Sequence, residues 1–259
     1  KSKRYLRLLP LIIIKLFLLI REKFRKIQLS MILPRIDFFC HWNRLDLEQI
    51  KKCFPRFNAE FLNFGYSSQT NYILRPNSQN IEENTRSATK NNKIMIGNCA
   101  SITLNHLTIL KYLLQFDKEL FEIFCPLSYG DPDYKDYLIS FAMKNKLNNL
   151  RILEEFISLK EYYYFLSQVD VLIMNNIRTQ GSGNIMSAIK LGKKVYINGQ
   201  NTHFKYLRDA GYVVCTTEEL FQSSLEEILT PLSQDQINHN RHLAKEMYSS
   251  YNTRYKNLP

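Results

Sequence analysis

The chain of 259 residues lacks the patterns that identify the commonest nucleotide, metal and covalent chemistries. It contains no dinucleotide-binding GxGxxG pattern, no Walker GK[ST] motif, and no GxSxG or Cys–His arrangement typical of a covalent nucleophile. The five cysteines are scattered without a CxxC pair, which favours free thiols in a reducing compartment over a disulfide framework. Among the five histidines only His239 and His242 lie close together, without a nearby cysteine, so no metal site is predicted.

Positive charge is concentrated at one end of the chain. The net charge is +11, and residues 1–26 contribute +8 of it through nine basic side chains and one acid, Glu22. The nearly neutral remainder argues against a nucleic-acid-binding surface spread over the protein. Few aromatic residues interleave with the basic ones, so nucleic acid is not a predicted partner.

An apolar run from Leu8 to Ile20 lies within this basic end, and Lys15 is its only charged residue. The run is shorter than the roughly 20 residues of a spanning helix, and no small-residue cleavage site follows it. A membrane-surface helix, a helix buried against the protein and a spanning helix remain open. We favour the first, with an anionic membrane surface as the predicted partner of residues 1–26.

Short apolar segments alternate with amphipathic segments along the chain, as in an α/β protein. The elements expected first are a strand at 35–40, a helix at 46–54 capped by Asp46, and a strand at 59–64. Residues 65–92 lose this periodicity and are rich in Ser, Asn and Thr, which indicates a linker or surface loop. We therefore predict two domains, residues 1–90 and 91–259.

From residue 93 the alternation is regular, which predicts a doubly wound parallel sheet with helices on both faces. The expected strands are 93–97, 121–127, 149–153, 169–175, 193–198 and 212–216. The expected helices are 104–116, 131–145, 159–168, 184–192, 202–210, 217–229 and 233–250.

In such a sheet, ligands bind beyond the carboxyl ends of the strands, so the loops after strands are the candidate sites. The first of them, GNCASITLNH at 97–106, has small residues that let a ligand approach the backbone. It leads into a helix whose free N–H groups suit phosphate. A plain strand-to-helix turn capped by Thr103 explains the same residues.

The second loop is PLSYGDPDY at 126–134. Asp131 followed by Pro132 starts a helix, so neither residue needs a role in catalysis. Tyr129 and Tyr134 are less well explained by structure, because tyrosines at such a position can stack on a base or hydrogen-bond a sugar.

The third loop, NNIRTQGSGN at 175–184, is the strongest candidate. Gly181 and Gly183 lie at the entry to a helix, where exposed amides and a positive helix end favour an anion. Arg178 and Gln180 can offer a charged fork and an amide to a diphosphate. A plain turn would not require an arginine, a glutamine and three asparagines, so we predict a ligand here.

Four motifs, GNCASITLNH, PLSYGDPDY, RTQGSGNI and LGKKVYI, resemble the TDP-N-acetylfucosamine:lipid II N-acetylfucosaminyltransferases, the 4-alpha-L-fucosyltransferases of glycosyltransferase family 56. The resemblance covers roughly residues 35–250, with the motifs in the family's order. It implies a GT-B fold, with a donor-binding C-terminal domain and, in this chain, a truncated N-terminal acceptor domain. A complete acceptor domain usually has more residues than precede the boundary near residue 90, so the chain is expected to be a fragment or to have a reduced acceptor domain.

The family transfers 4-acetamido-4,6-dideoxygalactose from a dTDP-sugar to a lipid-linked saccharide at the cytoplasmic face of the bacterial inner membrane. This step belongs to enterobacterial common antigen or related polysaccharide synthesis. The resemblance therefore implies a dTDP-sugar donor, a lipid-diphosphate-linked acceptor and peripheral attachment to that membrane, without a cofactor.

The resemblance also implies a donor site built from all three loops. The donor side would be lined by Asn98, Ser101, Asn105 and His106. The sugar or base would lie near Tyr129, Gly130 and Tyr134. The diphosphate would be held by Arg178, Gln180, Gly181, Gly183 and Asn184. The family usually has two glutamines before the glycine, and Thr179 stands in place of the first.

The resulting hypothesis is glycosyl transfer without a bound metal, in which helix N-termini and Arg178 stabilise the charge of the departing dTDP. The sequence identifies no catalytic base, although Asp37 and His41 are the ionisable residues nearest a strand end in the first domain. The alternative is a non-catalytic, membrane-associated module that binds a nucleotide sugar.

Overall fold

The computed structural model describes residues 19–64 and 92–256, with side chains through residue 247. The chain divides into two compact units, unit 1 (residues 1–65) and unit 2 (residues 66–259). The apolar run predicted to lie on a membrane falls almost wholly outside the described residues, as does most of the predicted linker. A domain boundary near residue 90 therefore remains a prediction.

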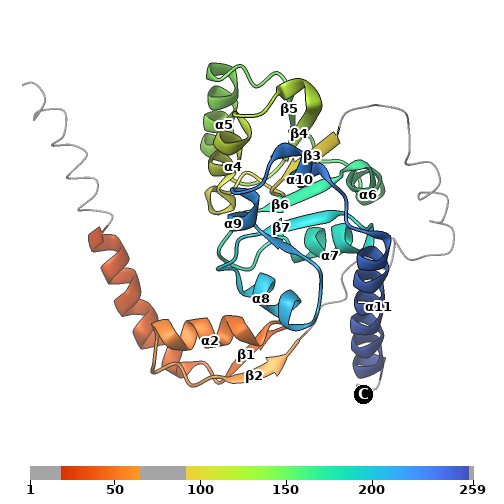
Figure 1. The fold of residues 1–259 in the computed structure, drawn as a ribbon. Coiled ribbons are helices and arrows are strands. Elements are labelled where there is room, and N and C mark those ends of the chain that lie inside the picture. Colours follow the sequence, from red (N-terminus) through yellow and green to blue (C-terminus); the bar gives the residue numbers. More distant parts are fainter. Residues whose placement is uncertain (1–18, 65–91, 257–259) are drawn as a thin grey trace, which may run out of the picture. The chain divides into compact units, whose positions relative to one another are not determined.

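Unit 2 is built on one sheet of six parallel strands in the order β5-β4-β3-β6-β7-β8 (Figure 1). The strands are β3 (Asn92–Ile96), β4 (Phe121–Pro126), β5 (Leu150–Leu153), β6 (Val171–Met174), β7 (Lys194–Ile197) and β8 (Cys215–Thr216). The chain runs from β3 outward to β5, then returns to the other side of β3 and continues outward to β8. This order confirms the predicted doubly wound sheet.

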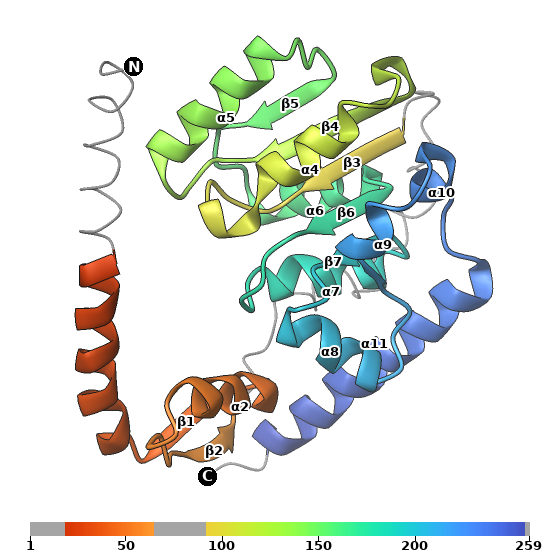
Figure 2. The same cartoon turned by 60° about the vertical axis from the view of Figure 1, so that its left-hand side comes forward.

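Helices connect these strands and cover both faces of the sheet. They are η4 (Ile102–Leu104), α4 (His106–Leu113), η5 (Lys118–Leu120), α5 (Pro132–Lys144), α6 (Leu159–Gln168), α7 (Ser182–Lys190), α8 (Thr202–Asp209), α9 (Thr217–Leu220), α10 (Leu225–Leu229) and α11 (Gln234–Lys256). Figures 1 and 2 show α4 and α5 on one side of the sheet and α6, α7 and α11 on the other.

Alternate residues of each central strand enter two separate hydrophobic cores. In β3, Ile94 and Ile96 pack with α4, α5, α9 and α10, whereas Met95 packs with α6, α7, α8 and α11. The same alternation divides β6, where Ile173 faces the first core and Leu172 the second. A strand buried on both faces reads as a continuous apolar run, which is why the sequence identified these strands.

The helix predicted over 217–229 is instead two short helices, α9 and α10. The side chain of Thr216 accepts a hydrogen bond from the N–H of Glu219, and Ser224 accepts one from that of Glu227. Each glutamate bonds back to the N–H of its cap, so both helices begin with a complete capping box. The second capping box begins a new helix at α10, so residues 217–229 do not form a single helix.

Two other predicted helix caps are wrong. Asn43, not Asp46, caps α2, because its side chain accepts a hydrogen bond from the N–H of Leu45. Thr103 does not cap α4, since it lies inside the preceding turn η4 and Asn105 occupies the N-cap position. The predicted cap at Asp131, with Pro132 in the first turn of α5, is confirmed. The last strand is also shorter than predicted, with only two residues in β8.

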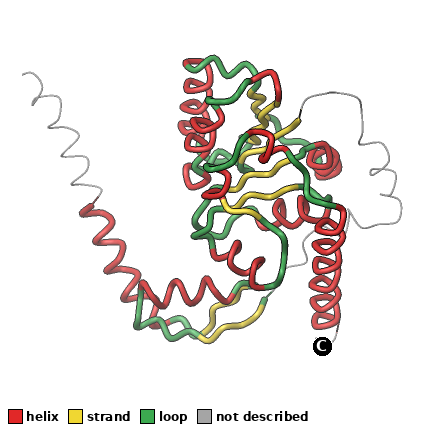
Figure 3. Tube along the Cα trace, viewed as in Figure 1, coloured by secondary structure: helices red, strands yellow, loops and turns green. Residues whose placement is uncertain are grey.

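Unit 1 contains a helix over residues 19–32 and a small parallel sheet beside a second helix (Figure 3). Its other elements are η1 (Leu33–Arg35), β1 (Phe38–His41), α2 (Arg44–Cys53) and β2 (Glu60–Asn63), with β1 paired to β2. The buried core is small and consists of Leu47, Phe57 and Ala59 with partly buried neighbours. No helix in the described part of the chain is both long and apolar enough to cross a bilayer.

Candidate functional site

The loops after β3, β4 and β6 meet at the carboxyl edge of the sheet in unit 2. β3 and β6 are neighbours where the strand order reverses, which is where open α/β sheets bind ligands. The N–H of Gly97 donates to the carbonyl of Ile173 (2.9 Å), and that of Ala100 donates to the carbonyl of Tyr129 (2.8 Å). The N–H of Asp131 donates in turn to the carbonyl of Ala100 (2.7 Å). Backbone hydrogen bonds thus join the first loop to the second loop and to β6, which leads into the third.

Gly130 makes the approach of the first two loops possible. Its φ is 117°, and an added Cβ would lie 2.5 Å from the carbonyl oxygen of Ala100. That oxygen belongs to backbone and cannot move aside as a side chain could. Glycine at this position is therefore a requirement of the loop junction itself.

Side chains join the first loop to the third. The Thr103 hydroxyl donates to Oε1 of Gln180 (3.0 Å) and accepts from Nε of Arg178 (3.3 Å). Gln180 also donates from Nε2 to the sulfur of Cys99 (3.2 Å), and burial raises the pKa of that thiol. The hydroxyl of Ser101 lies 2.8 Å from that of Thr103. These contacts hold the third loop against the first.

Asn98 and Tyr129 form a second link between the first two loops. Nδ2 of Asn98 donates to the hydroxyl of Tyr129 (2.7 Å), whose side chain is 53% exposed and whose pKa is raised by partial burial. Oδ1 of Asn98 is buried and has no hydrogen-bond partner among the described residues. It lies close to Gly181, where an added Cβ would be 3.2 Å away. The exposed tyrosine ring is the part of this pair open to a ligand.

Three further predicted site residues make contacts inside the protein. His106 and Tyr134 are buried and contact each other through Nδ1 and the hydroxyl (3.3 Å). Burial lowers the pKa of His106 to about 4 and raises that of Tyr134 to about 12, so both are neutral near pH 7. These two buried side chains support the first two loops from inside the protein. Asn105 likewise acts within the protein, donating from Nδ2 to the carbonyl of Asn175 (3.0 Å).

Arg178 and the first turn of α7 form an exposed group of hydrogen-bond donors. Gly181 is the N-cap residue of α7, with a φ of 67°, and no side chain caps the helix. Asn184 is partly exposed in the same turn, and its N–H donates to the carbonyl of Gly181 (2.9 Å). Nothing lies within 4 Å of a Cβ added at Gly183. The arrangement leaves amides at a positive helix end beside an exposed guanidinium, which suits an anion.

Two asparagines of the third loop have structural roles, so their presence is not by itself a sign of a ligand. Oδ1 of Asn175 accepts hydrogen bonds from Asn198 (3.0 Å) and Thr217 (3.0 Å). Asn201 donates from Nδ2 to the carbonyl of Asn176 (2.7 Å). These partners fix the loop's path, and they were missed because they come from the next two strand-to-helix loops.

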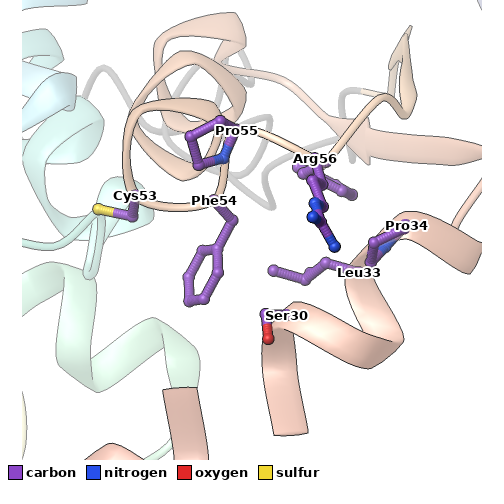
Figure 4. A pocket seen from close by; sticks show the side chains of 8 residues that line it. Ser30, Leu33, Pro34, Cys53, Phe54, Pro55 and Arg56 are labelled. Atoms are coloured by element: carbon purple, nitrogen blue, oxygen red, sulfur yellow. The ribbon is translucent and has the colours of Figure 1, made fainter. Parts of the chain in front are cut away.

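Unit 1 has a separate cavity of about 350 Å³. Figure 4 shows it between the end of the first helix and the turn after α2, with lining residues Ser30, Leu33, Pro34, Cys53, Phe54, Pro55, Arg56 and Phe57. The walls are mainly apolar, and the exposed Arg56 gives the rim a positive charge.

The helix over residues 19–32 carries an exposed apolar stripe. Ile20, Phe24, Ile27 and Met31 recur at spacings of three and four residues, and all four are exposed. Four basic residues and one acid lie in the same helix: Arg21, Lys23, Arg25, Lys26 and Glu22. The helix is therefore amphipathic and basic.

The ionisable residues near β1 do not form a cluster that could hold a metal. His41 ends β1, and its Nδ1 lies 3.3 Å from Oδ2 of Asp46. Asp37 lies just before the strand and is exposed. Residues 19–64 and 92–256 contain no group of three or more His, Cys, Asp or Glu side chains placed to bind a metal ion.

The parallel six-stranded sheet, with its cluster of loops at the point where strand order reverses, defines the α/β fold of the GT-B glycosyltransferases. The family described as 4-alpha-L-fucosyltransferase, glycosyl transferase group 56, matches residues 37–254. The chain belongs to this family. Among curated proteins, no sequence relative matches it.

Solved structures share the fold at low sequence identity. WaaG, a glycosyltransferase involved in lipopolysaccharide biosynthesis, is 16% identical with a TM-score of 0.57, over 80% of this chain and 58% of its own. A Rickettsia africae glycosyltransferase is 13% identical with a TM-score of 0.62, over 89% of this chain and 66% of its own. Sucrose-phosphate synthase from Thermosynechococcus elongatus is 9% identical with a TM-score of 0.61, over 91% of this chain and 63% of its own. The chain thus spans about three fifths of the length of these proteins.

Proposed function

We propose that the protein transfers a 4-acetamido-4,6-dideoxyhexose of the N-acetylfucosamine type from a dTDP-sugar to a lipid-linked saccharide in bacterial surface polysaccharide synthesis. One observation carries the proposal. Arg178 and the uncapped first turn of α7 present hydrogen-bond donors where the strand order reverses, in a chain of the 4-alpha-L-fucosyltransferase family.

In this proposal the diphosphate lies against Arg178 and the amides of Ser182 and Gly183. Neither amide has a hydrogen-bond partner within the described residues, and the helix end favours negative charge. As the bond from the sugar to dTDP breaks, charge builds on the leaving diphosphate, and these donors stabilise it without a metal. The sugar carbon forms its new bond to an acceptor hydroxyl, whose proton is released.

The remaining predicted residues divide into two groups in this proposal. Asn98, Ser101, Tyr129 and Gly130 lie at the loop junction, where we place the sugar and the base. Gln180, Gly181 and Asn184 complete the diphosphate side. His106, Tyr134 and Asn105 support the loops through contacts inside the protein.

Calorimetry of dTDP binding tests the diphosphate site. Arg178→Ala should weaken binding about tenfold or more, because a hydrogen bond to a charged group contributes about 1.5–3 kcal/mol. Arg151→Ala is the matched control, since Arg151 is an exposed arginine on β5 that bonds to Asn148 and Glu122. Unchanged affinity for Arg178→Ala would show that the diphosphate lies elsewhere.

Turnover is tested by incubating the protein with dTDP-, UDP- and GDP-sugars and a lipid-diphosphate saccharide, with products identified by mass spectrometry. A product formed from the dTDP-acetamido sugar alone supports the proposal. A product formed only from UDP or GDP donors contradicts the donor assignment.

We place the protein at the cytoplasmic face of the inner membrane, attached peripherally through unit 1. The exposed stripe and basic residues of the helix over 19–32 fit an anionic lipid surface, and they continue the basic segment predicted over residues 1–26. Phe24→Asp should reduce flotation with anionic vesicles. The matched control is Phe156→Asp, which changes an exposed phenylalanine of unit 2. Equal flotation of both variants would contradict this attachment.

A second candidate is a non-catalytic module that binds the nucleotide sugar. It is favoured by the small two-stranded sheet in the described part of unit 1. This candidate predicts dTDP binding that depends on Arg178, without product from any donor.

A further inference from the structure

The hydroxyl of Thr103 lies at the centre of a polar group drawn from two loops of unit 2. Its Oγ1 is 2.8 Å from Oγ of Ser101, 3.0 Å from Oε1 of Gln180 and 3.3 Å from Nε of Arg178. Thr103 comes from the loop after β3, whereas Gln180 and Arg178 come from the loop after β6. The side chain thus touches two of the residues that the proposed function assigns to the diphosphate, Gln180 and Arg178.

The chemistry of these partners fixes the direction of every bond. A hydroxyl has one hydrogen to donate and two lone pairs to accept with. Nε of Arg178 can only donate, so Thr103 accepts there, and Oε1 of Gln180 can only accept, so Thr103 donates there. The second lone pair is left for the hydroxyl of Ser101. The bonding capacity of Thr103 is therefore fully used inside the protein, and none remains for a ligand.

This arrangement leaves the two Nη groups of Arg178 available to a ligand. Nε bonds to Thr103, while Nη1 and Nη2 have no hydrogen-bond or ion-pair partner within residues 19–64 and 92–256. A guanidinium whose Nε is held has a fixed plane, and its two Nη groups form a fork that matches two phosphate oxygens. An exposed arginine without such an anchor would lose more rotamer freedom on binding.

Gln180 is held in the same way. Its Oε1 accepts from Thr103 and its Nε2 donates to the sulfur of Cys99, which is a weak acceptor. The bond to Thr103 is therefore the stronger of the two side-chain contacts that hold the carboxamide. Loss of the Thr103 hydroxyl would free Nε of Arg178 and leave the Gln180 side chain held only by its weak bond to Cys99.

We propose that Thr103 is a positioning residue, which orients Arg178 and Gln180 for the donor diphosphate without touching it. The inference rests on the proposed function, because it concerns the same site. It adds a residue that the family resemblance did not assign, and it explains how an exposed loop presents an ordered guanidinium.

The test compares three variants of the full chain by calorimetry with dTDP. Thr103→Val removes the hydroxyl and keeps the shape, and it should weaken binding about tenfold, the equivalent of one net hydrogen bond. Thr103→Ser keeps the hydroxyl and should restore affinity to within about twofold of the unsubstituted protein. The matched control is Thr108→Val, which changes an exposed threonine of α4 and should leave affinity unchanged. Because both threonines are exposed, every variant should remain folded, which its unfolding temperature checks.

A double substitution separates positioning from a direct contact. If Thr103 acts through Arg178, then Thr103→Val should cost less affinity in an Arg178→Ala background than in the unsubstituted protein. Full additivity, failure of Thr103→Ser to rescue, or normal affinity of Thr103→Val would each overturn the inference while the donor site stands. If the unsubstituted protein does not bind dTDP, the proposed function fails and the inference falls with it.

Discussion

His106 is a fully buried histidine beneath the first two loops, and its titration gives a measurable link between pH and stability. Burial lowers its pKa from the usual 6.5 to about 4 in the folded protein. Between these values the unfolded chain binds a proton that the folded protein does not, so acid favours unfolding. The stabilisation is complete above pH 6.5 and is lost as the pH falls toward 4.

The magnitude follows from the two pKa values. Each unit of pKa difference is worth about 1.4 kcal/mol, so the full loss from this group is about 3 kcal/mol, with about 2 kcal/mol lost by pH 5. His106→Gln replaces the imidazole with an amide that does not titrate. The variant should therefore lose less stability than the unsubstituted protein between pH 7.5 and pH 5, whatever its stability at pH 7.5.

Urea unfolding at pH 7.5, 6 and 5 checks this expectation. Both proteins share all other titrating groups. Subtracting one free energy of unfolding from the other at each pH therefore cancels the contributions of those groups. His242→Gln is the matched control, because it changes an exposed histidine of α11 in the same way. Parallel curves for the unsubstituted protein and His106→Gln would refute the reasoning, since they would show that the folded state protonates His106 as readily as the unfolded chain does.

Two glycines of the site should respond in opposite ways to alanine. Gly183→Ala should raise the free energy of unfolding by about 0.5–1 kcal/mol, because it lies in the first turn of α7 and its Cβ would meet nothing within 4 Å. If the diphosphate lies close to this backbone, calorimetry should show weaker dTDP binding by the same variant, and unchanged affinity would remove Gly183 from the site. Gly130→Ala should lower the free energy of unfolding by about 1–3 kcal/mol, because φ is 117° and Cβ would lie 2.5 Å from the oxygen of Ala100. A normal urea midpoint for Gly130→Ala would contradict the conclusion that the junction of the first two loops requires glycine at this position.

The sheet of unit 2 could be predicted from sequence because its strands carry a strong local signal. Residues 171–174 are buried on both faces and therefore apolar throughout, so the strand is visible without knowledge of its neighbours. The division of 217–229 into two helices was also visible, since Thr216 with Glu219 and Ser224 with Glu227 are both separated as in a capping box. The prediction of one helix over 217–229 did not use that spacing.

The three loops of the site could be predicted, but their internal contacts could not. The rule that ligands bind beyond parallel strands needs only the order of elements along the chain. Thr103 and Gln180, by contrast, are separated by 77 residues, and Asn175 and Thr217 by 42. Such pairs follow from which strands are neighbours in the sheet. Local patterns therefore offered Thr103 as a cap and counted Asn175 among the signs of a ligand.

The distribution of charge connects the two parts of the proposed function. Residues 1–64 hold 14 basic and five acidic side chains, whereas residues 92–259 hold 18 and 17. Because unit 2 is nearly neutral, it has no extended positive electrostatic field to attract dTDP. Recognition there must therefore depend on a few positioned amides and side chains such as Arg178. The basic excess of unit 1 suits an extended anionic surface, where many weak contacts add. We infer that salt should weaken vesicle binding more than dTDP binding, because the first depends on many exposed charges and the second on one oriented guanidinium.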